Sequence, residues 1–304
     1  IGVMVGGPTS RLTVDGFIEA GRDLEARGFD TMWIPHVCGH DAITLAARLG
    51  RETSRIELGT AVVPTYPRHP TAIAQQALSA GAAADGRFTL GIGLSHPPVI
   101  ERMIGLSYAR RASHMREYMA VIGPILRGEP VQFEGDEYRV DMQVAVEDFR
   151  PVPVILAALG EKMLEIAGRE SDGTILWMTG FRAIEEHVVP KLRAAAEAAG
   201  RPEPRTIAGM HVALTNEPDI ANAQMEKMLE QYRMMPSYKA NIDREGSMTP
   251  ADFALIGDEK ALDAQLDRLR DIGVTDLDAN ILETEEGGRK RTLDYLQSRL
   301  DGRG

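Results

Sequence analysis

Cysteine, long apolar runs and basic residues are all scarce in this sequence. Cys38 is the single cysteine among 304 residues, which excludes an internal disulfide and predicts a protein of the reducing cytoplasm. No apolar run approaches the roughly 18 residues of a membrane-spanning helix, so we expect no membrane partner. Residues 1–7 contain neither a basic segment nor a long apolar run, so we also expect no signal peptide.

The deficit of basic residues bears on the possible partners. The chain has 34 Lys and Arg residues against 45 Asp and Glu residues, a net charge of −11. Proteins that bind nucleic acid normally present a basic face, so we expect no nucleic-acid partner. An anionic small molecule can still bind where backbone dipoles oppose the overall field.

What the sequence does contain is an alternation of short apolar runs and helical patterns. The runs are residues 1–5, 31–35, 56–64, 88–94, 153–158, 174–178, 206–214 and 276–282. Continuously apolar strands separated by helices indicate a parallel sheet covered by helices, and eight such units predict a (β/α)₈ TIM barrel. A doubly wound sheet is the alternative, but no complete G-x-G-x-x-G follows the first run. No Pro/Gly/Ser-rich linker divides the chain, so a single barrel domain over residues 1–304 is expected.

Two segments interrupt the alternation. Residues 131–140 have strand character on both sides of Glu134-Gly135-Asp136, which predicts a hairpin. Residues 234–250 contain two prolines and are interpreted as an irregular segment, either a surface loop or a lid. We expect such insertions at the carboxyl ends of the barrel strands, where active sites lie.

Histidines follow two of the predicted strands. His36 follows the second, where imidazole, which titrates near neutral pH, could give or take a proton. The alternative is a solvated or core-edge histidine. His96 follows the fourth strand, either as a second proton-handling group or as a loop histidine that fixes the turn before Pro97.

Three further features have both a functional and a structural interpretation. His36, Cys38, His40 and Asp41 are residue types that bind zinc, but no second cluster follows, so no metal site is predicted. Gly160 precedes a predicted helix whose free N–H groups suit a phosphate, although a helix begins after every strand. Trp177 ends the sixth run and either walls a pocket or belongs to the core.

Several segments resemble, in chain order, signatures of the luciferase-like monooxygenase superfamily. They are residues 28–36, 55–64, 68–70, 85–93, 157–163 and 171–174. The ordered match covers residues 1–178 and continues more weakly to residue 282. The resemblance implies a barrel that binds coenzyme F420 or FMN, and the pattern is closer to that of the F420-dependent oxidoreductase branch.

The resemblance also implies individual site residues. His36 matches a histidine beside the deazaflavin ring of several F420 enzymes, although Pro35 stands where an aspartate often precedes it. His96 stands where some of these enzymes have a carboxylate, so His36 and His96 are the candidate catalytic residues. The expected cofactor-binding residues are His36, Thr60, Ala61, Val62, Leu94, Ser95, His96, Ala158, Leu159, Gly160, Glu161, Lys162 and Met163. Trp177 and Tyr238 are expected to contact substrate, and relatives that bind F420 imply a bulge with a cis peptide bond between Ala61 and Val62.

Three functions remain open at this point. The first is an oxidoreductase that transfers a hydride between F420 and a small organic substrate. The second is an FMN-dependent monooxygenase of the same superfamily, which uses reduced flavin and O₂. The third is a protein that binds a flavin-like cofactor without turnover. Barrels of this family often form dimers, so a homodimer is also expected from the resemblance.

Overall fold

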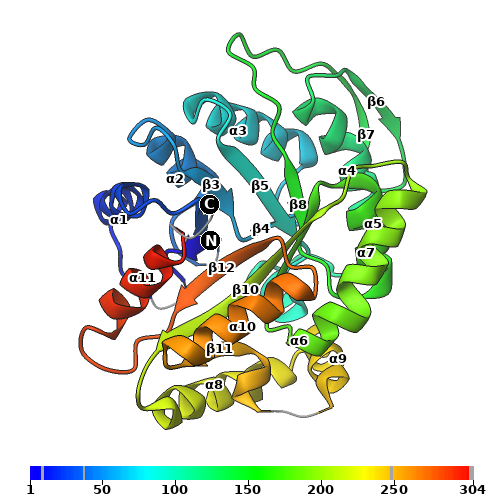
Figure 1. Ribbon diagram of the computed structural model, residues 1–304. Helices are drawn as coiled ribbons and strands as arrows, with labels where there is room; N and C mark the ends of the chain where they lie inside the picture. Colours follow the sequence, from blue (N-terminus) through cyan, green and yellow to red (C-terminus); the bar gives the residue numbers. More distant parts are fainter. Residues whose placement is uncertain (8–9, 37, 247–248, 301–304) are drawn as a thin grey trace.

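The chain folds into a closed barrel of eight parallel strands surrounded by helices (Figure 1). The computed structural model describes residues 1–7, 10–36, 38–246 and 249–300. The barrel strands are β1 (Gly2–Met4), β2 (Thr31–Ile34), β3 (Glu57–Thr60), β5 (Phe88–Gly93), β8 (Val154–Leu156), β9 (Gly173–Trp177), β10 (Arg205–Leu214) and β12 (Asp276–Ile281). Pairing of β1 with β12 and of β9 with β10 closes the ring. The predicted (β/α)₈ barrel is confirmed.

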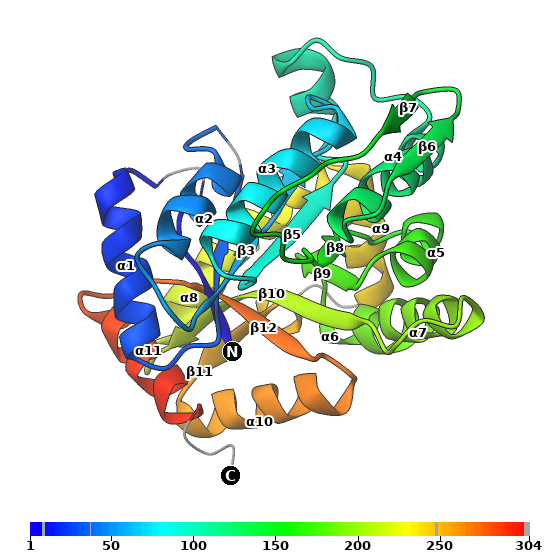
Figure 2. The same ribbon diagram turned by 90° about the horizontal axis from the view of Figure 1, so that it is seen from above.

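Helices cover the outside of this barrel in both views (Figures 1 and 2). They are α1 (Val14–Ala26), α2 (Ala42–Gly50), α3 (Pro70–Ala83), α4 (Arg111–Leu126), α5 (Glu161–Glu170), α6 (Phe181–Ala183), α7 (Val189–Ala198), α10 (Glu259–Asp271) and α11 (Gly288–Ser298). Side chains of Thr13, Asp41 and Asp258 accept backbone N–H groups at the starts of α1, α2 and α10. Such caps satisfy donors that the first helical turn leaves free. Within the described ranges, no helix is long and apolar enough to span a membrane.

The hairpin expected at residues 131–140 is confirmed, but it enters the fold at another point. Strands β6 (Val131–Glu134) and β7 (Arg139–Met142) pair antiparallel, and both lie beside α4 on the outside of the molecule (Figure 2). They belong to the connection that leads into β8, whereas the expectation placed them after a strand. The tip reaches back along α4, where Asp136 pairs with Arg110.

The segment 234–250 is not irregular, and this expectation was wrong. Helix α8 (Pro218–Arg233) is followed by a second helix, α9 (Pro236–Glu245), and by a short 3₁₀ turn, Pro250–Asp252. Both prolines occupy the first turn of their helices, where a missing N–H costs no hydrogen bond. Residues 247–248 lie outside the described residues. A short strand, β11 (Ala254–Gly257), then pairs with the second half of β10 and was not expected.

The barrel interior has its own small apolar core. Trp33, Ile155, Ile175 and Ile207 form a cluster separate from the larger core between barrel and helices. A Cβ on Gly59 would lie 2.2 Å from the Trp33 ring, so the ring fills space that only glycine leaves free. At the amino ends of the strands Arg205 binds Glu57 and Asp276 at 2.8 and 2.6 Å. Because this lower end is closed, the carboxyl ends form the open mouth.

Candidate functional site

A bulge in the third strand forms one side of the barrel mouth. Strand β3 ends at Thr60 and the short β4 (Val63–Pro64) continues it, so residues 61 and 62 interrupt the ladder. Gly59 pairs with Thr89 and Val63 with Ile92, which leaves one extra residue on this strand. The Ala61–Val62 peptide bond is cis, so the expected bulge and cis bond are both confirmed.

The side chain of Thr60 anchors this bulge. Its hydroxyl donates to the carbonyl of Gly91 and accepts from the N–H of Gly91, each at 2.8 Å. The side chain is fully buried. Thr60 was expected to bind cofactor, and its buried side chain holds the neighbouring residues of the bulge in place.

Small apolar side chains next to the bulge form a floor for the mouth. Ala61, Val62 and Ala157 are partly buried and pack on the interior cluster that contains Trp33. A Cβ on Gly93 would approach Val62 to 2.9 Å and Ala157 to 3.0 Å, so glycine is required there. A flat apolar ring system fits such a floor. We call Ala61, Val62 and Ala157 the apolar floor below.

Ala157 and Ala158, which follow β8, pack on opposite sides of the chain. Ala158 was expected to bind cofactor, but its side chain is 1% exposed and belongs to the outer core. Ala157 was not expected, and it faces the mouth. Neighbouring residues on an extended strand point to opposite sides, so only one of the two can face inward.

His36 lies two residues after β2, at the rim of the mouth. Its Nδ1 accepts the backbone N–H of Ala42 at the start of α2, at 3.3 Å. The neutral ring therefore carries its proton on Nε2. Burial and the Arg68 guanidinium lower the pKa of His36, and Asp41, 3.8 Å away, opposes them. The side chain is thus a neutral N–H donor at neutral pH.

His96 follows β5 on the adjoining part of the rim. Ser95 has a positive φ of 61°, which turns the chain after the strand. The carbonyl of Ser95 accepts the Tyr108 hydroxyl at 2.7 Å. The His96 ring lies 5.2 Å from the Tyr238 ring, and burial lowers its pKa. Leu94, Ser95 and His96 are all partly exposed, as a binding role requires.

The amino end of α5 is open to solvent. The first hydrogen bond inside the helix runs from the N–H of Leu164 to the carbonyl of Gly160, and no side chain caps the helix. The N–H groups of Glu161, Lys162 and Met163 are therefore free of helical partners. A Cβ on Gly160 would meet no atom within 4 Å. Free donors, the helix dipole and open space suit an anion.

His187 lies outside the barrel and holds the chain just before the start of α5. The sequence did not predict a role for this residue. Its Nε2 donates to the carbonyl of Leu159 at 2.9 Å, directly before Gly160. Burial lowers the pKa of His187, which keeps the ring neutral. Glu161 is held away from the helix end by an ion pair with Lys191 at 2.7 Å.

A chain of five aromatic rings lines the side of the mouth opposite His36, and we call it the aromatic wall. The Trp177 ring, at the end of β9, lies 5.0 Å from His211 and 6.5 Å from Tyr232. Tyr232 lies 4.9 Å from Tyr238, which contacts His96. Trp177 and Tyr238 were expected at the substrate site. His211 and Tyr232 were not, because single rings inside apolar patterns look like core.

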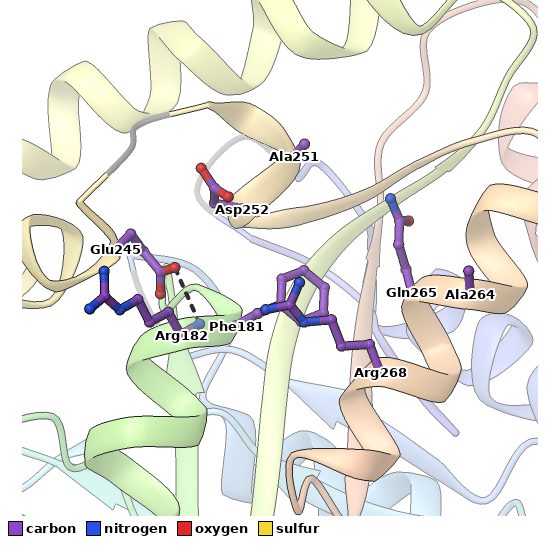
Figure 3. Close-up of a pocket in the computed structure, with 8 residues that line it drawn as sticks. All are labelled: Phe181, Arg182, Glu245, Ala251, Asp252, Ala264, Gln265 and Arg268. Carbon is purple, nitrogen blue, oxygen red and sulfur yellow. Dashed lines mark hydrogen bonds between the residues drawn. The ribbon is translucent and has the colours of Figure 1, made fainter.

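Helix α9 is fixed over this part of the barrel by two polar contacts. The Asn241 amide donates to the Thr179 hydroxyl at 3.2 Å. The Glu245 carboxylate accepts the N–H groups of Arg182 and Ala183 at 3.2 and 2.7 Å (Figure 3). Tyr238 is thereby placed at the rim.

A separate cleft of about 500 Å³ lies beyond this contact (Figure 3). It is lined by Phe181, Arg182, Glu245, Ala251, Asp252, Ala264, Gln265 and Arg268. The Glu245 carboxylate already accepts N–H groups at the start of α6. The Arg268 guanidinium lies 5.1 Å from the Phe181 ring. None of the predicted site residues lines this cleft, so we place the site at the barrel mouth.

Comparison with known proteins assigns the chain to a family. The family described as luciferase-like monooxygenase matches residues 3–276. The chain belongs to this family. An F420-dependent glucose-6-phosphate dehydrogenase of Kineococcus radiotolerans is 32% identical over 251 residues, 77% of this chain and 73% of that protein. A 5,10-methylenetetrahydromethanopterin reductase of Methanolobus tindarius is 27% identical over 83% of this chain and 81% of its own length.

A solved structure shares the fold of this chain. The coenzyme F420-dependent tetrahydromethanopterin reductase of Methanopyrus kandleri superposes with a TM-score of 0.77. The match covers 97% of this chain and 96% of the other, at 19% sequence identity. The eight-stranded barrel is therefore the fold of a known group of redox enzymes.

Within the described ranges, no three His, Cys, Asp or Glu side chains gather as a metal site. Two of the residues considered from the sequence as zinc ligands, Asp41 and His36, bind other groups. Asp41 pairs with Arg68 and accepts the N–H of Thr44, and His36 accepts the N–H of Ala42. Cys38 is exposed.

Proposed function

We propose that this protein transfers a hydride between coenzyme F420 and a small organic substrate. The observation that carries the proposal is that the apolar floor lies close to the open amino end of α5. Ala157 and Gly160 are three residues apart, so a span of at most about 11 Å separates the two places. A planar ring joined to a phosphate by a short chain fits this arrangement.

The F420-dependent relatives support this cofactor. Coenzyme F420, when bound, supplies a two-electron hydride donor or acceptor, which the chain's own side chains lack. Ala61, Val62 and Ala157 would cover one face of its ring and keep water from it. Gly160 to Met163 would hold its phosphate through backbone N–H groups.

The histidines at the rim are suited to the proton transfer that accompanies hydride transfer. When a carbon of the substrate gains or loses a hydride, its oxygen or nitrogen gains or loses a proton. His36 presents an Nε2–H after β2, and His96 is a partly buried imidazole after β5, which β3 separates from β2. Either can hold or pass that proton, and the aromatic wall would exclude water from the exchange.

A titration of the protein with F420 and with FMN tests this proposal. We expect saturable binding of F420, followed by absorbance or by quenching of its fluorescence, and weaker binding of FMN. Tight binding of FMN alone, with O₂ uptake when the flavin is reduced, would instead support the FMN-dependent monooxygenase that the family name suggests. Bound reduced cofactor that no acceptor reoxidises would support a binding protein without turnover.

We further propose that the protein works as a homodimer with no nucleic-acid or membrane partner. Met103, Ile104 and Leu106 follow the strand that carries His96 and leave 63%, 44% and 39% of their areas exposed. Exposed apolar side chains in one short segment are typical of an interface. Sedimentation at micromolar concentration should give twice the mass of one chain, and Met103→Asp with Ile104→Asp should shift it toward one.

A further inference from the structure

We propose that His211 binds the reacting oxygen of the substrate as a neutral Nδ1–H donor, and that Asn280 fixes this tautomer. The substrate would then be a small uncharged molecule that carries a carbonyl or hydroxyl group. The placement of His211 follows from the barrel itself, whereas its part in the reaction rests on the proposed function.

The strand register points His211 into the barrel at the height of the mouth. Ile207, on the same face of β10, belongs to the interior cluster. A Cβ on Gly209, the next residue on that face, would lie 3.0 Å from the Trp177 ring and 3.7 Å from Asp278. Gly209 pairs with Trp177, the last residue of β9, so His211 lies two residues beyond the end of that strand.

The contacts of the ring fix its orientation and its proton. His211 and Asn280 are direct neighbours on β10 and β12, and the Asn280 amide lies 3.3 Å from Nε2. An amide nitrogen can only donate, so Nε2 accepts and the proton of the neutral ring sits on Nδ1. Trp177 packs on the ring at 5.0 Å and an angle of 55°. Among the described residues, Asn280 is the only hydrogen-bond partner of this imidazole, which leaves Nδ1–H available.

The ring is neutral, and this selects the kind of ligand it can bind. His211 is 5% exposed, and burial lowers its pKa to about 4. A single neutral N–H stabilises partial negative charge on a carbonyl or hydroxyl oxygen, whereas the full charge of a phosphate or carboxylate needs several such donors, as at the start of α5, or a cation. Trp177 and Tyr232 add apolar surface beside it.

This role is compatible with a balanced carbonyl reduction. The carbonyl carbon gains a hydride, which carries two electrons, from the reduced cofactor; the C=O double bond becomes single, and the oxygen gains one proton. His211 would keep its own proton and donate a hydrogen bond to that oxygen, because losing the proton would create a strongly basic imidazolate. The transferred proton would come from solvent through the protonated form of His36 or His96, so that the ring that donates it returns to its neutral form.

Nitrogen-15 NMR of the histidine rings, on the apo-protein, tests the placement without any turnover. We expect His211 to be the Nδ1–H tautomer and to show no titration between pH 5 and 8. Cyclohexanone, as an uncharged carbonyl probe, should shift the His211 Nδ1 resonance, whereas glucose 6-phosphate at the same concentration should not. His114 is a matched control, since it is also buried with a pKa of about 4 but contacts Thr65 and Tyr138 instead of the wall. An Nε2–H tautomer, or equal shifts at His114, would overturn the proposal.

Variants separate hydrogen bonding from simple packing. An Asn side chain places its amide near the Nδ1 position of histidine, and a Gln side chain places it near Nε2. His211→Asn should therefore keep cyclohexanone affinity within about threefold, whereas His211→Gln and His211→Phe should weaken it about five- to tenfold. His114→Gln should leave it unchanged. Equal losses in the Asn and Gln variants would overturn the donor role, and if these variants fail to fold, the wild-type NMR result still decides.

The two proposals can fail separately. If F420 does not bind the wild-type protein, the proposed function fails, while the tautomer of His211 and its response to cyclohexanone remain to be judged in the apo-protein. If F420 binds and is turned over but cyclohexanone does not affect His211, only the present inference fails.

Discussion

Gly160→Val isolates the predicted phosphate site at the start of α5. The change adds an isopropyl group where the three free N–H groups of the first helical turn would meet an anion. In the structure a Cβ at this position meets nothing within 4 Å, and the backbone has φ −89° and ψ 158°, which suits any residue. The substitution is therefore accommodated without strain in the protein alone.

The stability change should be small because two effects oppose one another. Valine is a poorer residue than glycine at the position before a helix, at a cost of about 1 kcal/mol. It also restricts the unfolded chain, which contributes about 0.4–1 kcal/mol in favour of folding. The net change in free energy of unfolding is within about 1 kcal/mol, or about 2 °C in Tm for a chain of this size.

The effect on cofactor affinity should be much larger. A hydrogen bond to a charged group contributes about 1.5–3 kcal/mol, and the added methyl groups would prevent at least one N–H from reaching the phosphate. The Kd for F420 should therefore rise at least about tenfold. Fluorescence titration of wild type, Gly160→Ala and Gly160→Val should give a graded series, with Ala between the other two.

A ligand without the phosphate provides the control. The bare deazaflavin ring with its ribityl chain should bind the wild type and Gly160→Val equally, since only the contact at α5 is changed. Equal F420 affinity in the two proteins would place the phosphate elsewhere. A Tm loss of 5 °C or more would show instead that Gly160 is needed for folding.

Three other predictions follow from the same contacts. His36→Asn should lower turnover by about 10²–10⁴-fold with cofactor affinity within a few fold, as judged by reoxidation of reduced cofactor, and unchanged turnover would transfer the role to His96. Tyr238→Leu should raise the KM of the acceptor and leave cofactor affinity unchanged, so a parallel loss of both would contradict its place in the wall. Burial opposes ionisation of Glu25, but backbone N–H groups of residues 54–56 outweigh it and lower its pKa from 4.5 to about 2. The ionised Glu25 side chain therefore stabilises the fold fully above pH 4.5, and this contribution is lost as the pH falls toward 2. Glu25→Gln should lower the free energy of unfolding by about 1–2 kcal/mol at pH 7, after allowance for solvent screening, and by almost nothing at pH 2. Thermal melts at the two pH values measure this difference.

The barrel could be predicted because its strands are buried on both faces. All eight runs of the sequence overlap the eight barrel strands, since a continuous apolar run has few other stable places in a soluble fold. The helix α9 could not be predicted in this way. Its sequence is polar, and Pro236 and Pro250 look like loop signals, although each stands in the first turn of a helical segment.

The site could be predicted in part, for a related reason. His36, His96 and Gly160 follow strands directly, and the topology alone brings strand ends together. His211 lies within a strand and Ala157 directly continues one, and the side to which such a residue points depends on register, which one sequence does not give. A signal for His211 did exist, because it is the one ionisable residue between Thr206 and Leu214 in an otherwise apolar run.

Asn280 ends a series of three polar residues that face the barrel interior at every second position of β12. Asp276 pairs with Arg205 at the closed end, and Asp278 is fully buried, which raises its pKa. The third position contacts a titratable group at the mouth, His211, and there the chain has an amide. Asn280→Asp should raise the pKa of His211, because an adjacent carboxylate favours the imidazolium. We expect His211 to begin titrating above pH 5 in nitrogen-15 NMR, and an unchanged pKa would mean that residue 280 does not control the proton of this ring.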